Sequence, residues 1–161
     1  MLRPFTVCLF GHRRIEEPVL VEERLRVVIE EIVDEHKCVE FLVGREGEFD
    51  LLASSVIKDI KRRKDCPDCS LTLIMPYLKA DFLNNQQGYE DYYDSVQLCE
   101  ESSATHPKSA IKVRNRHMID RSDMCIFYVA SNNGGAYQTM KYAQGRNKKV
   151  INIREKWFQI N

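Results

Sequence analysis

Short apolar runs of strand length alternate with helical segments along the chain. Runs such as Phe5 to Phe10 and Val39 to Val43 are typical of strands buried on both faces of a parallel sheet. Between these two runs, residues 16–36 place apolar side chains on one helical face and acids on the other. Repeated βα units of this length require right-handed crossovers. We therefore predict an α/β fold, Rossmann-like and doubly wound, in which helices cover both faces of a mostly parallel sheet.

The same pattern continues to the end of the chain and contains no repeat or linker, which predicts a single domain over residues 1–161. Further strands are expected at residues 71–75, 96–98, 124–130 and 150–153. Further helices are expected at residues 49–63, near Glu90, at 109–122 and at 135–146. Residues 79–105 are the least regular segment, and their tyrosines are expected to pack rather than to stack a base.

The charges balance, since the chain carries 24 basic and 24 acidic residues. No global field attracts nucleic acid or an anionic membrane, so nucleic acid is disfavoured as a partner and no membrane association is expected. Residue 1 leads into a strand without the layout of a signal peptide. Six cysteines in such a chain are expected to be reduced thiols in a cytoplasmic protein.

Two of these cysteines, Cys66 and Cys69, have the spacing of half a zinc site or of a redox pair. No second pair of cysteines or histidines completes four ligands, and the pair follows a helix instead of opening one. We therefore expect a turn with two thiols, and no metal.

Glycines follow three of the predicted strands. The segments are Gly11-His12-Arg13, the stretch from Gly44 through Gly47 to Asp50, and Gly134-Gly135 at the start of a helix. Ligands of open parallel sheets bind at the carboxyl ends of the strands, and a helix N-terminus attracts anions. These segments therefore predict a pocket for a phosphorylated ligand, although none is a dinucleotide or Walker fingerprint.

Each polar residue of this pocket also has a structural alternative. Arg13 can bind phosphate or pair with the acids of the first helix, and His12 can be a hydrogen-bonded structural residue. Asp50 can bind a ribose hydroxyl or occupy a favourable first helical turn. Arg114, with Asn115, is expected to grip phosphate oxygens. The alternative for Arg114 is a salt bridge to a nearby aspartate, either Asp120 or Asp123.

The chain resembles the SLOG superfamily, named for the SMF/DprA and LOG proteins, and within it the YpsA-like branch. The matching segments, in order, are Phe10-Gly11-His12-Arg13, Gly44 to Asp50 with Ala53, Pro76-Tyr77, Tyr93-Asp94, Arg114-Asn115 with Met118 to Asp120, and Gly134-Gly135 with Thr139 and Tyr142-Ala143. The resemblance implies a Rossmann-like fold, binding of nucleotides or nucleotide-derived ligands, and a homo-oligomer.

The enzymes of this superfamily, the LOG phosphoribohydrolases, cleave the N-glycosidic bond of nucleoside monophosphates. Their glycine-rich loop leads to a catalytic glutamate, and the matching position here is Lys141. Cleavage needs a carboxylate to stabilise an oxocarbenium-like transition state, whereas an ammonium has the wrong charge. The comparison therefore argues against an enzyme, and we assign no catalytic residue and no cofactor.

From the sequence we therefore expect non-catalytic binding of a nucleotide or nucleotide-derived signalling ligand, for sensing or sequestration. Two alternatives remain: a nucleoside or nucleotide N-glycosidase or transferase using Glu46, Glu48 or Asp50, and a macromolecule-binding module like DprA. The expected ligand-binding residues are Gly11, His12, Arg13, Gly44, Gly47, Asp50, Arg114, Asn115, Gly134, Gly135, Thr139 and Lys141.

Overall fold

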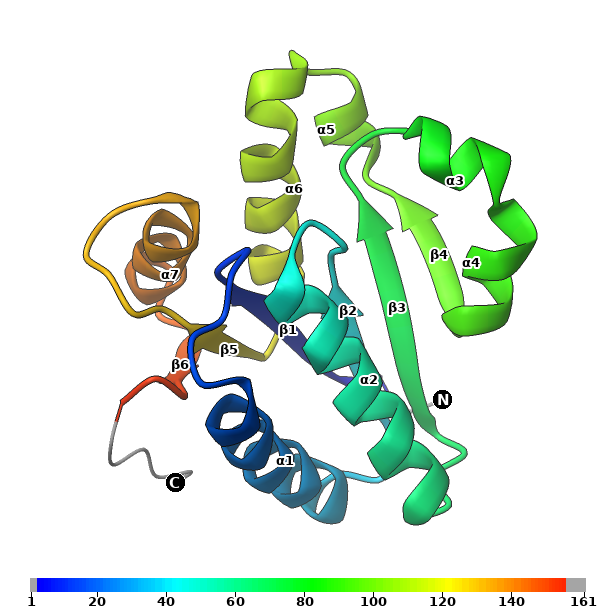
Figure 1. Cartoon of the computed structure of the whole chain (residues 1–161), viewed down its shortest axis with the longest axis vertical. Coiled ribbons are helices and arrows are strands. Elements are labelled where there is room, and N and C mark those ends of the chain that lie inside the picture. Colours follow the sequence, from blue (N-terminus) through cyan, green and yellow to red (C-terminus); the bar gives the residue numbers. More distant parts are fainter. Residues whose placement is uncertain (1–2, 156–161) are drawn as a thin grey trace.

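Six parallel strands form one sheet in the computed structural model, which describes residues 3–155 (Figure 1). The strands are β1 (Phe5–Gly11), β2 (Val39–Val43), β3 (Cys69–Met75), β4 (Ser95–Leu98), β5 (Met124–Tyr128) and β6 (Lys149–Asn152). The helices are α1 (Pro18–Glu35), α2 (Glu48–Arg63), α3 (Ala80–Asn84), α4 (Gln86–Tyr92), α5 (Glu100–Ser103), α6 (Pro107–Arg121) and α7 (Gly135–Gly145). Every neighbouring pair of strands is parallel, which confirms the predicted Rossmann-like α/β fold.

The strand order is β4-β3-β2-β1-β5-β6. The chain therefore moves outward from β1 to β4 and then returns to place β5 on the other side of β1. These two strands pair from Val7 with Met124 to Gly11 with Tyr128. The order reverses between them, and in open α/β sheets such a reversal creates a crevice at the carboxyl ends of the strands. The predicted glycine segments after β1, β2 and β5 all lie at this edge.

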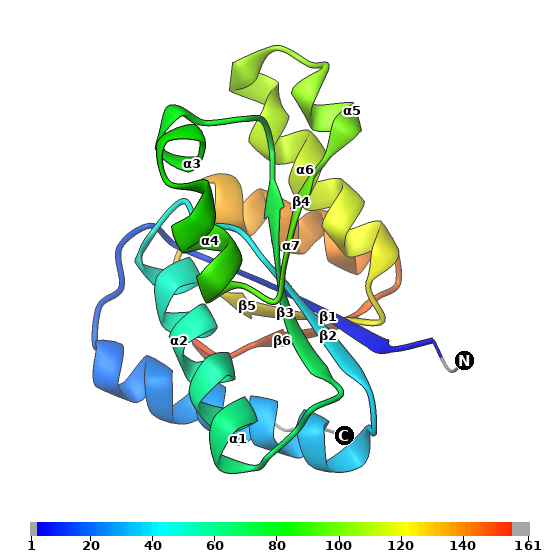
Figure 2. The same cartoon turned by 90° about the vertical axis from the view of Figure 1, so that its right-hand side faces the viewer.

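Helices cover both faces of the sheet (Figures 1 and 2). On one face, α1 and α2 pack against strand residues such as Val7 and Leu9. On the other face, residues of α6 and α7 pack against the alternate strand residues, including Cys8 and Phe10. Successive strand residues point to opposite faces. This explains why β1 is a continuous apolar run, buried from Thr6 to Phe10.

Two predicted boundaries moved for identifiable reasons. The first helix begins at Pro18 instead of residue 16, because Glu17 adopts a left-handed conformation with φ of 55° and proline is favoured in a first helical turn. The strand predicted to reach residue 130 ends at Tyr128. Beyond it, the N–H of Val129 donates to the Asn152 side chain and the N–H of Ala130 donates to His12.

The irregular segment contains two helices that were not predicted, α3 and α5, beside the expected α4 and β4. Two of its tyrosines, Tyr89 and Tyr93, are buried in the core. Burial and the neighbouring Cys66 raise the pKa of the Cys69 thiol to about 11, which disfavours its reactive thiolate. Residues 3–155 contain no cluster of three potential metal ligands. In the same residues, no helix is long and apolar enough to cross a membrane.

Candidate functional site

A cavity of about 360 Å³ opens at the carboxyl edge of the sheet, and we call it the edge cavity. Its lining includes most of the predicted ligand-binding residues: Gly11, His12, Arg13, Gly44, Gly47, Asp50, Arg114, Asn115, Gly135 and Thr139. Phe10, Glu46, Ile111 and Ala136 complete it. The structure therefore brings these residues together at one edge of the sheet, and the contacts of each residue indicate its role.

A larger cavity of about 630 Å³ shares part of this lining and extends between α6 and α7. We call it the basic cleft. It is lined by Arg13, Lys108, Ile111, Lys112, Asn115, Arg116, Gly135, Gln138, Thr139, Lys141 and Tyr142. Lys141, which the sequence resemblance sets at the position of the LOG glutamate, is exposed here and does not line the edge cavity. Gly134 lies outside both linings and caps α7 with φ of 90°.

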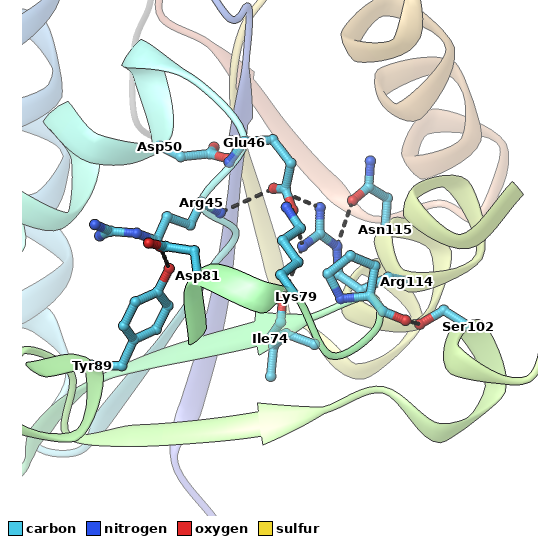
Figure 3. A network of polar contacts seen from close by, with 11 residues as sticks. Arg45, Glu46, Asp50, Ile74, Lys79, Asp81, Tyr89, Ser102, Arg114 and Asn115 are labelled. Atoms are coloured by element: carbon cyan, nitrogen blue, oxygen red, sulfur yellow. Dashed lines mark hydrogen bonds and ion pairs between the residues drawn. The ribbon is translucent and has the colours of Figure 1, made fainter. Parts of the chain in front are cut away.

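Arg114 forms a buried ion pair with Glu46, and both residues line the edge cavity (Figure 3). Its Nη1 and Nη2 donate to the two Glu46 carboxylate oxygens at 3.1 and 3.0 Å, and Nη1 also donates to the Ile74 carbonyl at 2.8 Å. Its Nε donates to the Asn115 side chain at 2.9 Å. Arg114 is 3% exposed, and these hydrogen bonds use four of its five N–H donors. A salt bridge was foreseen for this arginine, but the acidic partner is Glu46 rather than Asp120 or Asp123.

Two carboxyl groups of the edge cavity have opposite titration behaviour. Burial works against ionisation of Glu46, but the charges of Arg114 and Lys79 and the hydrogen bonds from Arg114 outweigh it and hold its pKa at about 2. In contrast, burial and the nearby negative charge of Glu46 raise the pKa of Asp50 to about 7. The Asp50 carboxylate accepts one hydrogen bond, from the N–H of Glu46 at 2.9 Å. The cavity thus contains one permanently ionised carboxylate and one that titrates near neutrality.

Three of the predicted glycines are required by the protein's own packing. A Cβ on Gly11 would collide with the Phe49 ring, and one on Gly44 would collide with the Glu46 carboxylate. A Cβ on Gly47 would collide with the backbone of Arg13. These three glycines therefore make room for other protein atoms around the cavity, whereas the sequence pattern suggested close approach to a ligand.

The glycines of the third segment are different. A Cβ at Gly134 or Gly135 would have no protein atom within 4 Å. The first N–H groups of a helix lack intrahelical partners, so the N-terminus of α7 presents donors and a positive dipole end at the junction of the two cavities. This is the position in the site best suited to an anion.

His12 has a structural contact within the site. Its Nε2 accepts a hydrogen bond from the Ala130 N–H at 2.8 Å, and its ring packs edge-on against Tyr128. Partial burial lowers the pKa of His12, so the imidazole is neutral and can accept at neutral pH. His12 therefore ties the loop after β1 to the loop after β5, which is the structural alternative raised for it.

The basic cleft gathers five cationic side chains, most of which were not among the predicted site residues. Lys108, Lys112 and Arg116 recur at four-residue intervals on one face of α6, and Arg13 and Lys141 face the same cavity. All five are exposed, and among residues 3–155 no acidic residue lines the cleft. Within residues 3–155, none of these side chains forms an ion pair with an acid. The four-residue spacing of the cations is visible in the sequence, but the sequence does not show that they line a cleft.

Comparisons with known proteins identify a similar fold but do not assign the chain to a family. No protein-family model and no curated protein matches the chain. The class that the fold defines is the Rossmann-like α/β fold of the DprA type. A solved structure of DNA processing protein A from Helicobacter pylori, described for its unique single-stranded DNA binding mode, matches with a TM-score of 0.63 and 18% identity. The match covers 91% of this chain and 64% of that protein, so this chain spans less than two thirds of its neighbour.

This comparison contradicts two sequence-based expectations. The sequence favours a small-molecule nucleotide ligand and disfavours nucleic acid, whereas the neighbouring DNA processing protein A binds single-stranded DNA. Of the sequence-based expectations, only the alternative of a DprA-like macromolecule-binding module agrees with what this neighbour binds. The physical reason for the error is that net charge averages over the whole surface, whereas five cations gather in one cleft without acids.

Proposed function

We propose that this protein binds single-stranded nucleic acid through the basic cleft. The observation that carries the proposal is the row of Lys108, Lys112 and Arg116 along α6, faced by Lys141 and Arg13 in a cavity without acids. Unpaired cations lining a groove attract a phosphate backbone and release its counterions. The donors at the N-terminus of α7 add a fixed site for one phosphate.

The length of the row favours a strand over a single phosphate. Four residues of helix span about 6 Å, so Lys108 and Arg116 lie about 12 Å apart along the α6 axis. This distance suits several successive phosphates. Tyr142 also lines the cleft, with the Arg116 guanidinium 4.9 Å from its ring centroid. Aromatic and guanidinium faces beside a basic groove are the features on which single-stranded bases stack. The single-stranded DNA binding of the DprA neighbour supports the same function.

Fluorescence anisotropy with a labelled oligo(dT) of about 20 nucleotides tests the proposal, since such sites cover about 4–16 nucleotides. We expect the Lys108→Gln/Lys112→Gln double variant to lose about tenfold or more in affinity, because each lysine contributes a charge-assisted contact. The slope of log affinity against log salt should also become shallower by about 0.7 for each cation removed.

The matched control is Arg62→Gln/Arg63→Gln, which removes the same charge from the end of α2, outside the basic cleft. Both arginines pair with Asp59 and are exposed, so their replacement should leave the fold and the affinity nearly unchanged. Absence of oligo(dT) binding by the unmodified protein at low salt, or equal losses in the two double variants, would refute the proposal.

The finer assignments from the sequence are also proposals. The SLOG-like segments that run from Phe10 to Ala143 support membership of the YpsA-like branch and a single domain over residues 1–161. A cytoplasmic location fits the free cysteines of the chain. Formation of a homo-oligomer rests on the family resemblance alone, and sedimentation of the purified protein tests it.

A further inference from the structure

We propose that Asp50, by gaining or losing one proton, controls whether a phosphate group of the bound strand can occupy the edge cavity. This inference rests on the proposed function and concerns the regulation of the same site. It begins from the lining of the edge cavity, where the Asp50 carboxyl lies with Arg13 and with Gly135 at the N-terminus of α7. The two positive elements attract a phosphate, whereas an ionised Asp50 repels it.

The other carboxylate of the cavity cannot perform this role. Glu46 is held ionised by the bidentate contact from Arg114 and by Lys79, whose Nζ lies 3.4 Å from Oε1 (Figure 3). It also accepts from the Arg45 N–H at 3.0 Å. Its charge is therefore constant over the pH range of living cells. Asp50, in contrast, receives one hydrogen bond and no ion pair within residues 3–155.

The pKa of Asp50 depends on the charged groups around it, and a phosphate bound in the edge cavity would be one more such group. Glu46, in the loop after β2, repels the ionised form, and Arg114 of α6 partly stabilises it. Arg13 and His12, from the loop after β1, line the same cavity, and His12 is neutral near pH 7. An entering phosphate adds negative charge beside Asp50 and raises its pKa above the value of about 7 in the free protein.

The sign of the pH effect follows from this shift. Since the bound state holds the proton more tightly than the free state, strand binding takes up a proton at pH above about 7. Below about pH 7, Asp50 is already protonated in both states and affinity is constant. As the pH rises above this value, affinity should fall by up to about tenfold per pH unit until it levels off at the pKa of the bound state.

The test measures oligo(dT) affinity by anisotropy from about pH 6 to about pH 9 at constant ionic strength. The unmodified protein should bind tightly up to neutrality and progressively more weakly above it. Asp50→Asn keeps an oxygen that can accept from the Glu46 N–H, so it should bind as tightly as the protonated form at every pH. His12→Gln removes the imidazole that lines the same cavity, and this variant should retain the pH dependence.

A second measurement needs no variant. Titration calorimetry of the unmodified protein with oligo(dT) at about pH 8, in two buffers of different ionisation enthalpy, should report net proton uptake. A flat affinity profile, an unchanged slope in Asp50→Asn, a profile abolished by His12→Gln, or net proton release would overturn the inference while strand binding stands. Absence of strand binding at every pH would instead refute the proposed function, and this inference with it.

Discussion

Glu46 and Arg114 form a bidentate ion pair in the lining of the edge cavity, with N–O distances of 3.1 and 3.0 Å. The pair connects the loop after β2 to α6, and the contact from Arg114 to the Ile74 carbonyl adds β3 to the same network (Figure 3). Glu46 and Arg114 are 68 residues apart in the sequence, and their side chains are only 12% and 3% exposed. The ion pair is therefore a tertiary contact, and it holds the loop after β2, α6 and β3 together at the candidate site.

The ion pair predicts a large loss of stability when one partner is removed. Arg114→Met leaves the Glu46 carboxylate buried with its main partner gone, and this should lower the free energy of unfolding by about 3–5 kcal/mol. Urea unfolding followed by circular dichroism measures the loss. Arg146→Met, which breaks an exposed pair with Asp120, should cost about 1 kcal/mol or less. Equal losses in the two variants would mean that the buried pair has no special role.

The Asp50 side chain should destabilise the folded state at neutral pH. Its pKa rises from 3.8 to about 7 on folding, so the ionised form is disfavoured in the folded state, and stability falls as pH rises through this window. Asp50→Asn should therefore raise the free energy of unfolding by about 2 kcal/mol or more at pH 8, since each pKa unit corresponds to about 1.4 kcal/mol. The gain should shrink toward pH 4 in chemical unfolding experiments at a series of pH values. A gain that is the same at all pH values would contradict the assignment.

The glycines of the site should separate into two groups on substitution by alanine. Gly44→Ala places a methyl group against the Glu46 carboxylate and the Arg114 guanidinium, which should cost about 1–3 kcal/mol. Gly135→Ala adds its methyl group to open space at the start of α7, where alanine is a better helix former. Thermal unfolding should show a lower midpoint for the first variant and an unchanged or higher midpoint for the second.

Gly135 also provides a binding test that leaves the fold intact. Gly135→Val puts a branched side chain at the junction of the two cavities without contacting protein atoms near its Cβ. We expect affinity for oligo(dT) to fall by about tenfold or more, since the side chain blocks approach to the donors at the N-terminus of α7. Wild-type affinity in a variant confirmed as folded would place the strand elsewhere on the surface.

The site is expected to release no free base from AMP, GMP, CMP or UMP on prolonged incubation. In the resemblance to the LOG phosphoribohydrolases, Lys141 stands where they carry a catalytic glutamate, and an ammonium there would oppose the positive charge that develops on the ribose. Glu46 is engaged by Arg114, and Glu48 accepts from the Ile15 N–H at 2.7 Å outside the edge cavity. Chromatography of the reaction mixture is the measurement. Base release that disappears in Asp50→Asn but survives in Lys141→Ala would establish a glycosidase that uses Asp50 as its acid or base.

The sequence by itself determined the fold and the edge of the sheet at which the candidate residues gather. Strand-length apolar runs separated by amphipathic helices can bury their faces in few ways, so the parallel sheet followed from periodicity alone. The glycine segments after β1, β2 and β5 then had to meet at one edge, because the carboxyl ends of parallel strands lie together. These conclusions depend on local patterns and on general rules of packing.

Only the tertiary structure decided what each residue does there. The partner of Arg114 is Glu46, 68 positions away, and no local pattern distinguishes it from Asp120 or Asp123. The glycines Gly11, Gly44 and Gly47 make room for protein atoms, which can be learned only from the neighbours that packing brings. Likewise, the charge of a site depends on which side chains share a cavity, and net charge in the sequence does not contain that information. For this reason the basic cleft emerged only when α6, α7 and the loop after β1 were assembled around it.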